Sequence, residues 1–213
     1  MSMKEMPVWA EGEEFVNSLT HGIAAALSVV GTYFLFKSEK NSHCKRNLIS
    51  KLIFGLSMII LYTASCVYHG VTDIRIKKPM RYIDHCSVFL LIAGSYTPVT
   101  VNVLWGKTGK TMLISVWTIA LIGIFAKIFF FDLIYDYTVY FYIALGWVVA
   151  FNIKTVYKAL ARRGMFWLAL GGVTYTLGTY FYAKDYNKYY HAIFHIFILF
   201  GTVFQYIAIL KYT

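Results

Sequence analysis

Two histidines lie four residues apart in the sequence YYHAIFHIFILF, inside a segment that is otherwise apolar. Because residues at i and i+4 share one face of a helix about one turn apart, His191 and His195 can direct their imidazoles at one point. His69 ends a second apolar segment, and Asp84 begins a third. Three neutral imidazoles beside a carboxylate are typical of a catalytic zinc site, in which the fourth position is left for water. The pattern predicts a Zn²⁺ site with His69, His191 and His195 as ligands.

Each of these residues, taken alone, also has a purely structural interpretation. The histidine pair could form hydrogen bonds between helices or face lipid headgroups, and His69 could be an ordinary packed side chain. Asp84 could cap a helix next to Arg81 or Lys78. Agreement in depth and side among four residues from three segments favours the metal site. Ionisable groups at membrane depth are costly, which also favours a function for them.

A second polar set precedes the first apolar segment. Glu14, Asn17 and His21 are spaced i, i+3 and i+7, so they form one stripe on a helix. An acidic first turn also suits the helix dipole, and that alone would explain Glu14. Beside the histidines, the stripe predicts a layer that supports the ligands or polarises a substrate. Ser65, one turn before His69, could orient water or a carbonyl, although serine also bonds its own helix backbone.

The composition indicates that these segments cross a membrane. Of the 213 residues, 59% are hydrophobic and only 14% are charged, whereas a soluble domain has about a quarter charged. The apolar residues form continuous blocks of about twenty, which fits helices and not the alternating strands of a barrel. We therefore expect an all-α polytopic membrane protein with one domain, 1–213, folded as a seven-helix bundle. The expected spans are about 17–37, 48–69, 81–104, 111–131, 137–154, 164–183 and 190–212.

The charges favour a lipid bilayer as the partner and exclude a nucleic-acid function. The net charge of +10 comes from basic residues in short loops, where topology and anionic headgroups explain them. The three cysteines form no CxxC motif, so no disulfide framework is expected. The first sixteen residues lack the pattern of a cleavable signal peptide.

The distribution of basic residues between the two faces predicts the orientation of the chain in the membrane. With seven spans, five of the six histidines lie in the leaflet that faces the N-terminus, and His43 is the exception. Seven basic residues fall on that face and twelve on the opposite face, which favours an N-terminus outside. Lys127, near the end of the fourth span, is expected to extend towards the headgroups.

Three motifs, in order along the chain, resemble those of a known family. They are E-x2-N-x3-H beginning at Glu14, S-x3-H beginning at Ser65 with Asp84 in RYIDHCSVFLLIAGSYTP, and H-x3-H beginning at His191. This arrangement resembles the progestin and adipoQ receptor superfamily, in particular its bacterial hemolysin III branch, over nearly the whole chain. Phe194 and Gln205 depart from it, because tryptophan and histidine are frequent at the matching positions.

The resemblance implies a seven-helix bundle with zinc bound by the residues matching His69, His191 and His195, and with Asp84 holding the water ligand. It implies kinship with alkaline ceramidases, which hydrolyse a lipid amide, and a role in membrane-lipid homeostasis. It also implies a bacterial plasma membrane and a cytoplasmic N-terminus, which conflicts with the distribution of basic residues.

Three functions follow as hypotheses. The leading one is a zinc-dependent hydrolase of a lipid amide or ester, in which Asp84 accepts the proton and Ser65 assists. The second is a receptor-like sensor without enzymatic activity, in which the zinc is structural. The third is a pore-forming cytolysin, which is disfavoured because a pore needs polar residues in both leaflets and the polar cluster occupies one.

Overall fold

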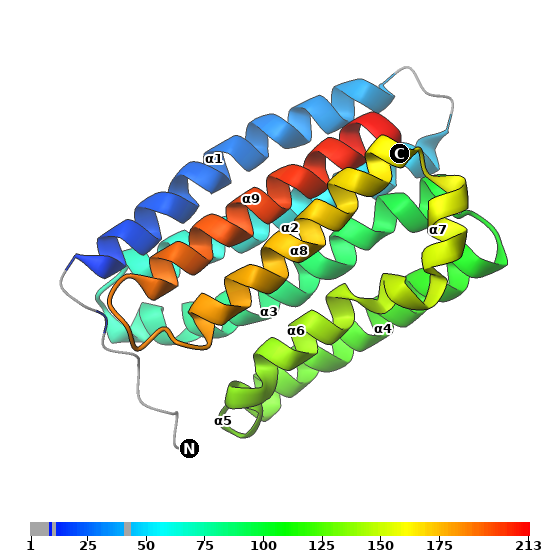
Figure 1. The fold of residues 1–213 in the computed structure, drawn as a ribbon. Helices are drawn as coiled ribbons and strands as arrows, with labels where there is room; N and C mark the ends of the chain where they lie inside the picture. The colour runs from blue at the N-terminus through cyan, green and yellow to red at the C-terminus, as the bar shows by residue number, and fades with distance from the viewer. Residues whose placement is uncertain (1–8, 10–11, 41–43) are drawn as a thin grey trace.

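All regular structure in the described part of the chain is helical. The structure, a computed structural model, describes Trp9 and residues 12–40 and 44–213. Six long helices and one broken segment, 131–159, alternate in direction along the bundle (Figure 1). The long helices are α1 (Glu13–Glu39), α2 (Lys45–Gly70), α3 (Ile74–Pro98), α4 (Lys107–Phe129), α8 (Arg162–Tyr182) and α9 (Tyr190–Tyr212). This confirms the all-helical prediction.

The segment between α4 and α8 is broken where the sequence predicted one unbroken span over 137–154. It consists of α5 (Phe131–Ile134), the 3₁₀ turn η2 (Tyr135–Tyr137), α6 (Thr138–Gly146), the 3₁₀ turn η3 (Val148–Asn152) and α7 (Ile153–Ala159). At the main break, the Tyr96 hydroxyl of α3 donates to the Gly146 carbonyl at 2.6 Å and accepts from the Val149 amide at 3.0 Å. A side chain thus replaces backbone hydrogen bonds that the helix lacks there.

The helices close into a ring, because α1 packs on α2, α2 on α3, α3 on α4, α4 on α6, α6 on α8, α8 on α9, and α9 on α1. The first turn of α1, the last turn of α2 and the first turn of α9 lie at one end of the bundle, and the C-terminus lies at the other (Figure 1). We call these the histidine end and the far end. Every long helix therefore joins the two ends.

Six segments are long and apolar enough to cross a membrane, namely 13–39, 45–70, 74–103, 107–129, 131–159 and 190–212. The helix α8, with 21 residues, has the length of a span at about 1.5 Å per residue. The mean hydropathy of α8 is lower than that of these six segments, because it contains several glycines, threonines and tyrosines and two arginines. The fold is therefore that of a polytopic membrane protein.

Two glycines in the sequence GGVTYTLG allow α8 to pack closely on α9. A Cβ atom at Gly171 would lie 2.8 Å from Gln205 Nε2, and one at Gly178 would lie 2.8 Å from Phe197 Cβ. These glycines allow the two helices to approach closely. Gly172 has no such neighbour and faces the central cavity.

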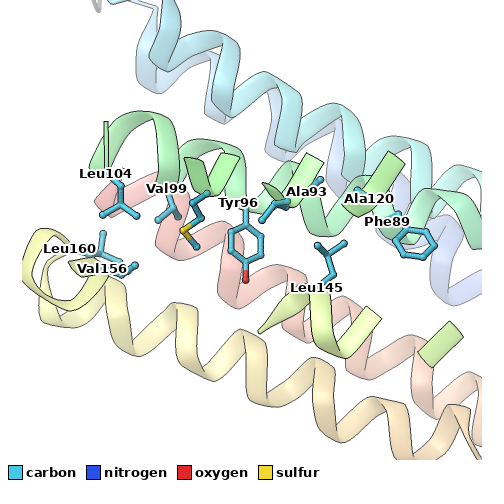
Figure 2. Packing of buried hydrophobic residues seen from close by; sticks show 11 residues of the cluster. Phe89, Ala93, Tyr96, Val99, Leu104, Ala120, Leu145, Val156 and Leu160 are labelled. Carbon is cyan, nitrogen blue, oxygen red and sulfur yellow. The ribbon is translucent and has the colours of Figure 1, made fainter. Parts of the chain in front are cut away.

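The apolar core of the second half joins α3, α4 and α6 (Figure 2). Phe89, Val116 and Leu145 are buried in it at 1% exposure or less. After Pro98, which cannot donate a backbone hydrogen bond, α3 continues as a π-helical turn, η1 (Val99–Val103). The third membrane segment thus ends in a widened turn beside this core.

Candidate metal centre and its cavity

Three predicted ligands meet at the histidine end. His69 comes from the last turn of α2, and His191 and His195 come from the first two turns of α9. One ring nitrogen from each lies within 4.8 Å of the others, and all three side chains are buried. Since Zn–N bonds of about 2.0–2.1 Å place tetrahedral ligands roughly 3.3 Å apart, binding needs side-chain shifts of about 1 Å.

In each histidine of the triad, one buried ring nitrogen has no hydrogen-bond partner among the described residues. His69 Nε2, His191 Nδ1 and His195 Nδ1 are buried without a hydrogen bond to any described residue. Unsatisfied buried polar atoms are rare in native proteins, and an ion at the site is one explanation for them. Imidazole is a preferred ligand of zinc. The residues present therefore fit Zn²⁺.

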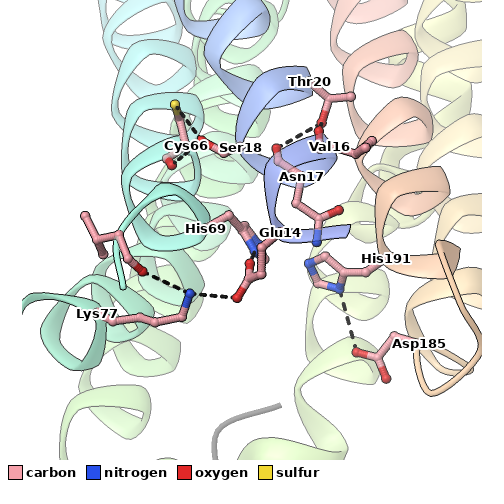
Figure 3. Close-up of polar contacts among 11 residues, drawn as sticks. Glu14, Val16, Asn17, Ser18, Thr20, Cys66, His69, Lys77, Asp185 and His191 are labelled. Carbon is pink, nitrogen blue, oxygen red and sulfur yellow. Dashed lines mark hydrogen bonds and ion pairs between the residues drawn. The ribbon is translucent and has the colours of Figure 1, made fainter. Parts of the chain in front are cut away.

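Glu14 holds the ring of His69 from the other side. Its Oε2 lies 2.6 Å from His69 Nδ1, and its Oε1 accepts a hydrogen bond from Lys77 Nζ at 2.6 Å (Figure 3). A neutral His69 that donates from Nδ1 presents Nε2 to the space between the three histidines. Helices α1 and α3 thus orient a side chain of α2.

Other side chains pack on the two histidines of α9. Trp9 lies 4.3 Å from His191 between ring centroids, and Asp185 Oδ2 lies 3.7 Å from His191 Nδ1, which is too long for a good hydrogen bond. His21 stacks on His195 with centroids 3.6 Å apart. The rings at this end support one another by direct contact.

The predicted stripe on α1 reaches the site. Asn17 and His21 are buried at 0% and 3% exposure, and their side-chain nitrogens and oxygen have no hydrogen-bond partner among the described residues. Together with Glu14, they bring α1 against the histidines. By contrast, Trp9, Lys77 and Asp185 were not anticipated, because they lie outside the spans or at their ends and no motif spacing marks them.

Asp84 and Ser65 come to the same region from α3 and α2. The Ser65 hydroxyl is buried beside the Asp84 carboxylate without a well-aligned hydrogen bond, and Arg81 lies within electrostatic reach. Both residues line a cavity that is also lined by His21, His191 and His195. The structure therefore brings all eight predicted site residues to one end of the bundle.

The cavity has a volume of about 230 Å³ and runs through the centre of the helix ring. From the histidine end it extends past Leu91 and Tyr96 to Met112, Met165 and Gln205 near the far end. Its walls are mostly aliphatic and aromatic, and its polar groups gather where the histidines lie. This arrangement suits a ligand with an apolar chain and a polar reacting group.

Lys127 does not extend to the headgroups, so that expectation was wrong. Its side chain is fully buried, and Nζ has no hydrogen-bond partner among the described residues. Nζ lies 4.4 Å from the Phe131 ring centroid and 5.2 Å from that of Tyr135, while Arg81 Cζ lies 5.1 Å and 5.0 Å from the same rings. A desolvated cation gains about 2 kcal/mol from an aromatic face, which is less than the several kcal/mol that burial of an ion costs.

The comparisons with known proteins show the family of the chain. The sequence profile described as Haemolysin-III related matches residues 10–206. The chain therefore belongs to the haemolysin-III related family of membrane proteins.

Individual relatives cover almost the whole chain. The Hemolysin-3 homolog of Bacillus subtilis (strain 168) is 37% identical over 200 residues, which are 94% of each chain. Hemolysin-3 of Bacillus cereus is 34% identical over 94% of this chain and 91% of its own. The human Monocyte to macrophage differentiation factor is 26% identical over 94% of this chain and 84% of its own, which fits the wider superfamily. No solved structure matches the chain.

Proposed function

We propose that this protein is a seven-span, zinc-dependent hydrolase of a lipid amide or ester in the plasma membrane. The observation that carries the proposal is the buried histidine triad beside Asp84 at the head of an apolar cavity. The seventh span is α8, which packs on α6 and α9 inside the ring. A role in membrane-lipid homeostasis follows from this substrate class.

The ligands are His69, His191 and His195. A bound Zn²⁺ supplies a Lewis acid that activates water at neutral pH and polarises the carbonyl of the substrate. Glu14 keeps His69 in the tautomer whose Nε2 faces the triad.

The remaining site residues act on the substrate and its proton. Asp84 accepts the proton of the attacking water and delivers it to the leaving group. Ser65, next to Asp84, donates a hydrogen bond that orients the water or the carbonyl. The apolar cavity holds the lipid chain and fixes the carbonyl at the histidine end. Asn17 and His21 form the wall of the site on the side of α1, which carries them.

Metal content and turnover test the proposal. Purified wild-type protein is expected to hold one zinc ion per chain by mass spectrometry, and His191→Ala is expected to hold none. His85→Gln is the matched control, since His85 is a buried histidine that packs on Phe131 and not on the triad. Turnover of a lipid amide or ester should require zinc and fall by about a hundredfold to ten-thousandfold in Asp84→Ala, from loss of a general base. Equal turnover with chelator and in Asp84→Ala would refute the mechanism.

Orientation belongs to the same proposal. We place the N-terminus and the triad towards the cytoplasm, following the family resemblance and against the count of basic residues. A reporter fused to the C-terminus is then expected to be active only outside the cytoplasm.

One observation favours a structural zinc as a second candidate. Helices α2 and α9, which carry the ligands, are not neighbours in the ring and are joined by side-chain contacts such as the 2.6 Å hydrogen bond from Tyr62 to Thr202. A metal would add a strong link between them. In that case chelation lowers the melting temperature sharply, while no lipid is turned over.

A further inference from the structure

We propose that Tyr182 is a further catalytic residue, whose hydroxyl donates a hydrogen bond to the carbonyl oxygen of the substrate and to the oxyanion that forms from it. Tyr182 is the last residue of α8 and lies outside the three sequence motifs. The inference rests on the proposed hydrolase and adds the residue that stabilises the developing negative charge.

The first argument is the position of this side chain. Tyr182 lines the cavity that also holds Asp84 and Ser65. Its ring lies 6.1 Å from that of His191 between centroids. Helix α8 packs on α6 and α9, whereas Ser65 and Asp84 come from α2 and α3. The hydroxyl therefore approaches the head of the cavity from a different side than the proposed general base.

The second argument is that no contact within the described part of the chain uses this hydroxyl. Tyr182 Oη is buried and has no hydrogen-bond partner among the described residues. The carboxylates of Asp84 and Asp185 lie within electrostatic reach, but neither accepts a hydrogen bond from it. A buried donor without an acceptor costs free energy, so an acceptor on a bound ligand accounts for its presence at this place.

A second tyrosine on the same helix serves as a comparison. Tyr175 precedes Tyr182 by seven residues, so the two lie on one face of α8, and both line the cavity. The Tyr175 hydroxyl lies 2.8 Å from Thr202 Oγ1, which also accepts a hydrogen bond from Tyr62 at 2.6 Å. The deeper hydroxyl thus joins α8 to α9, whereas the hydroxyl beside the triad joins nothing that the structure describes.

The third argument is that packing holds the ring of Tyr182 in place. Its centroid lies 5.0 Å from that of Phe194 on α9. Phe194 also lies against Gly178, one turn earlier on α8, where a Cβ atom would be 3.6 Å from Phe194 Cδ2. A donor that is fixed before the reaction stabilises charge without having to reorganise.

The chemistry of a phenol fits this role. A phenol keeps its proton at neutral pH, and tyrosine is one of the side chains that form oxyanion holes. As the water oxygen bonds to the carbonyl carbon, the π electrons of the C=O bond move to the carbonyl oxygen and the water proton passes to Asp84. Asp84 becomes neutral in this step, and the new negative charge lies on the oxygen that Tyr182 contacts.

Ligand binding to the full-length protein in detergent tests the inference. The probes are methyl octylphosphonate, whose tetrahedral anion resembles the oxyanion, and N-methylnonanamide, the neutral amide with the same alkyl chain. Binding is measured by calorimetry on the zinc-loaded and the chelator-treated protein. Tyr182→Phe should weaken phosphonate binding by about tenfold to a hundredfold in both forms, the range for hydrogen bonds to charged groups, and amide binding by less than about tenfold. Tyr175→Phe is the matched control and should leave both affinities unchanged.

Melting temperature and turnover separate catalysis from packing. Tyr182→Phe should melt at the wild-type temperature, because the hydroxyl has no described partner to lose, whereas Tyr175→Phe should melt lower. With a lipid that the wild type hydrolyses, Tyr182→Phe should lower kcat by about a hundredfold to a thousandfold and leave KM nearly unchanged.

Two results would overturn the inference. One is unchanged phosphonate affinity in Tyr182→Phe in both forms of the protein. The other is a fall in its melting temperature at least as large as in Tyr175→Phe, since that would assign the hydroxyl to the fold. Failure here leaves the zinc content of the wild type and its dependence on Asp84 untouched. If the hydrolase proposal fails and no zinc is found, the loss of phosphonate affinity in the chelator-treated protein is still expected.

Discussion

The two ends of the bundle differ in how many of their buried polar side chains have hydrogen-bond or ion-pair partners. At the far end, Lys51 pairs with Glu39 at 2.8 Å and Ser50 donates to Asn102 at 3.0 Å. At the histidine end, one ring nitrogen of each triad histidine, the side-chain amide of Asn17 and the ammonium of Lys127 are buried without a hydrogen bond to any described residue. Asn102 Nδ2 is the one atom at the far end with the same deficit in the described part of the chain.

The difference in hydrogen bonding indicates that the far end serves stability and the histidine end serves function. Native proteins satisfy nearly all buried polar groups, so a concentration of unsatisfied ones at one end points to ligands that belong there. At the far end, the buried ammonium of Lys51 has its partner in Glu39, so this contact is structural. Substitutions at the two ends should therefore produce different kinds of loss.

The largest effect is expected at the triad itself. His195→Phe keeps an aromatic ring on His21 but removes a ligand nitrogen, so zinc should be lost completely from the purified protein by elemental analysis. The metal-free variant should melt within a few degrees of the metal-free wild type, because it keeps the packing of the ring and loses only the hydrogen bond between the His195 ring and the Asn17 backbone. A large fall in the melting temperature of the metal-free form would mean that the triad is structural without a metal.

The far end should respond in stability alone. Lys51→Met leaves the Glu39 carboxylate without its partner in a mostly buried site, which should cost about 3 kcal/mol of unfolding free energy. Zinc content should stay at the wild-type level. The double variant Lys51→Met with Glu39→Gln should recover most of the loss, as measured by thermal unfolding in detergent. Loss of zinc in Lys51→Met would contradict the separation of the two ends.

A smaller effect is expected where a residue positions a ligand. Glu14→Gln should lower zinc affinity by about tenfold to a hundredfold, the usual range for partners of metal-bound histidines. Asp185→Asn should have less effect, because Asp185 lies 3.7 Å from His191. Competition with a fluorescent zinc chelator measures both. An equal loss of zinc affinity in the two variants would mean that the distance from the carboxylate to the imidazole does not determine the size of the loss.

The smallest effect is expected at the break in the fifth segment. Tyr96→Phe removes both hydrogen bonds to Gly146 and Val149, which should cost about 1–3 kcal/mol of unfolding free energy. Tyr206→Phe is the matched control, since it removes a single hydrogen bond to Gly31 in an unbroken helix. Equal losses would mean that the break does not depend on Tyr96.

The sequence predicted the elements whose apolar blocks end sharply. The segment expected at 190–212 agrees with α9, and the i, i+4 spacing of His191 and His195 was enough to place their rings together. Other spans extend beyond the apolar blocks, as in α3, which begins at Ile74 and not at 81, because charged residues at a membrane interface continue a helix. Hydropathy cannot locate such an end.

Three features could not be predicted because they depend on partners distant in sequence. The break after Gly146 depends on a hydroxyl from α3, and the ring of His69 is held by Glu14, which is 55 residues away. Lys127 has the sequence context of an interfacial lysine. In the structure its ammonium is covered by two rings, Phe131 from α5 and Tyr135 from η2. Each of these follows from how helices pack and not from any pattern within one helix.

The hydroxyl of Tyr96 also has a consequence for how the wall formed by α6 and α7 moves. The backbone at Gly146 and Val149 loses its contact with α3 when Tyr96 changes rotamer. An intact helix opens only when several backbone hydrogen bonds break at once. The amide of Val149 is therefore the point in this wall where deuterium should enter early in a hydrogen-exchange experiment.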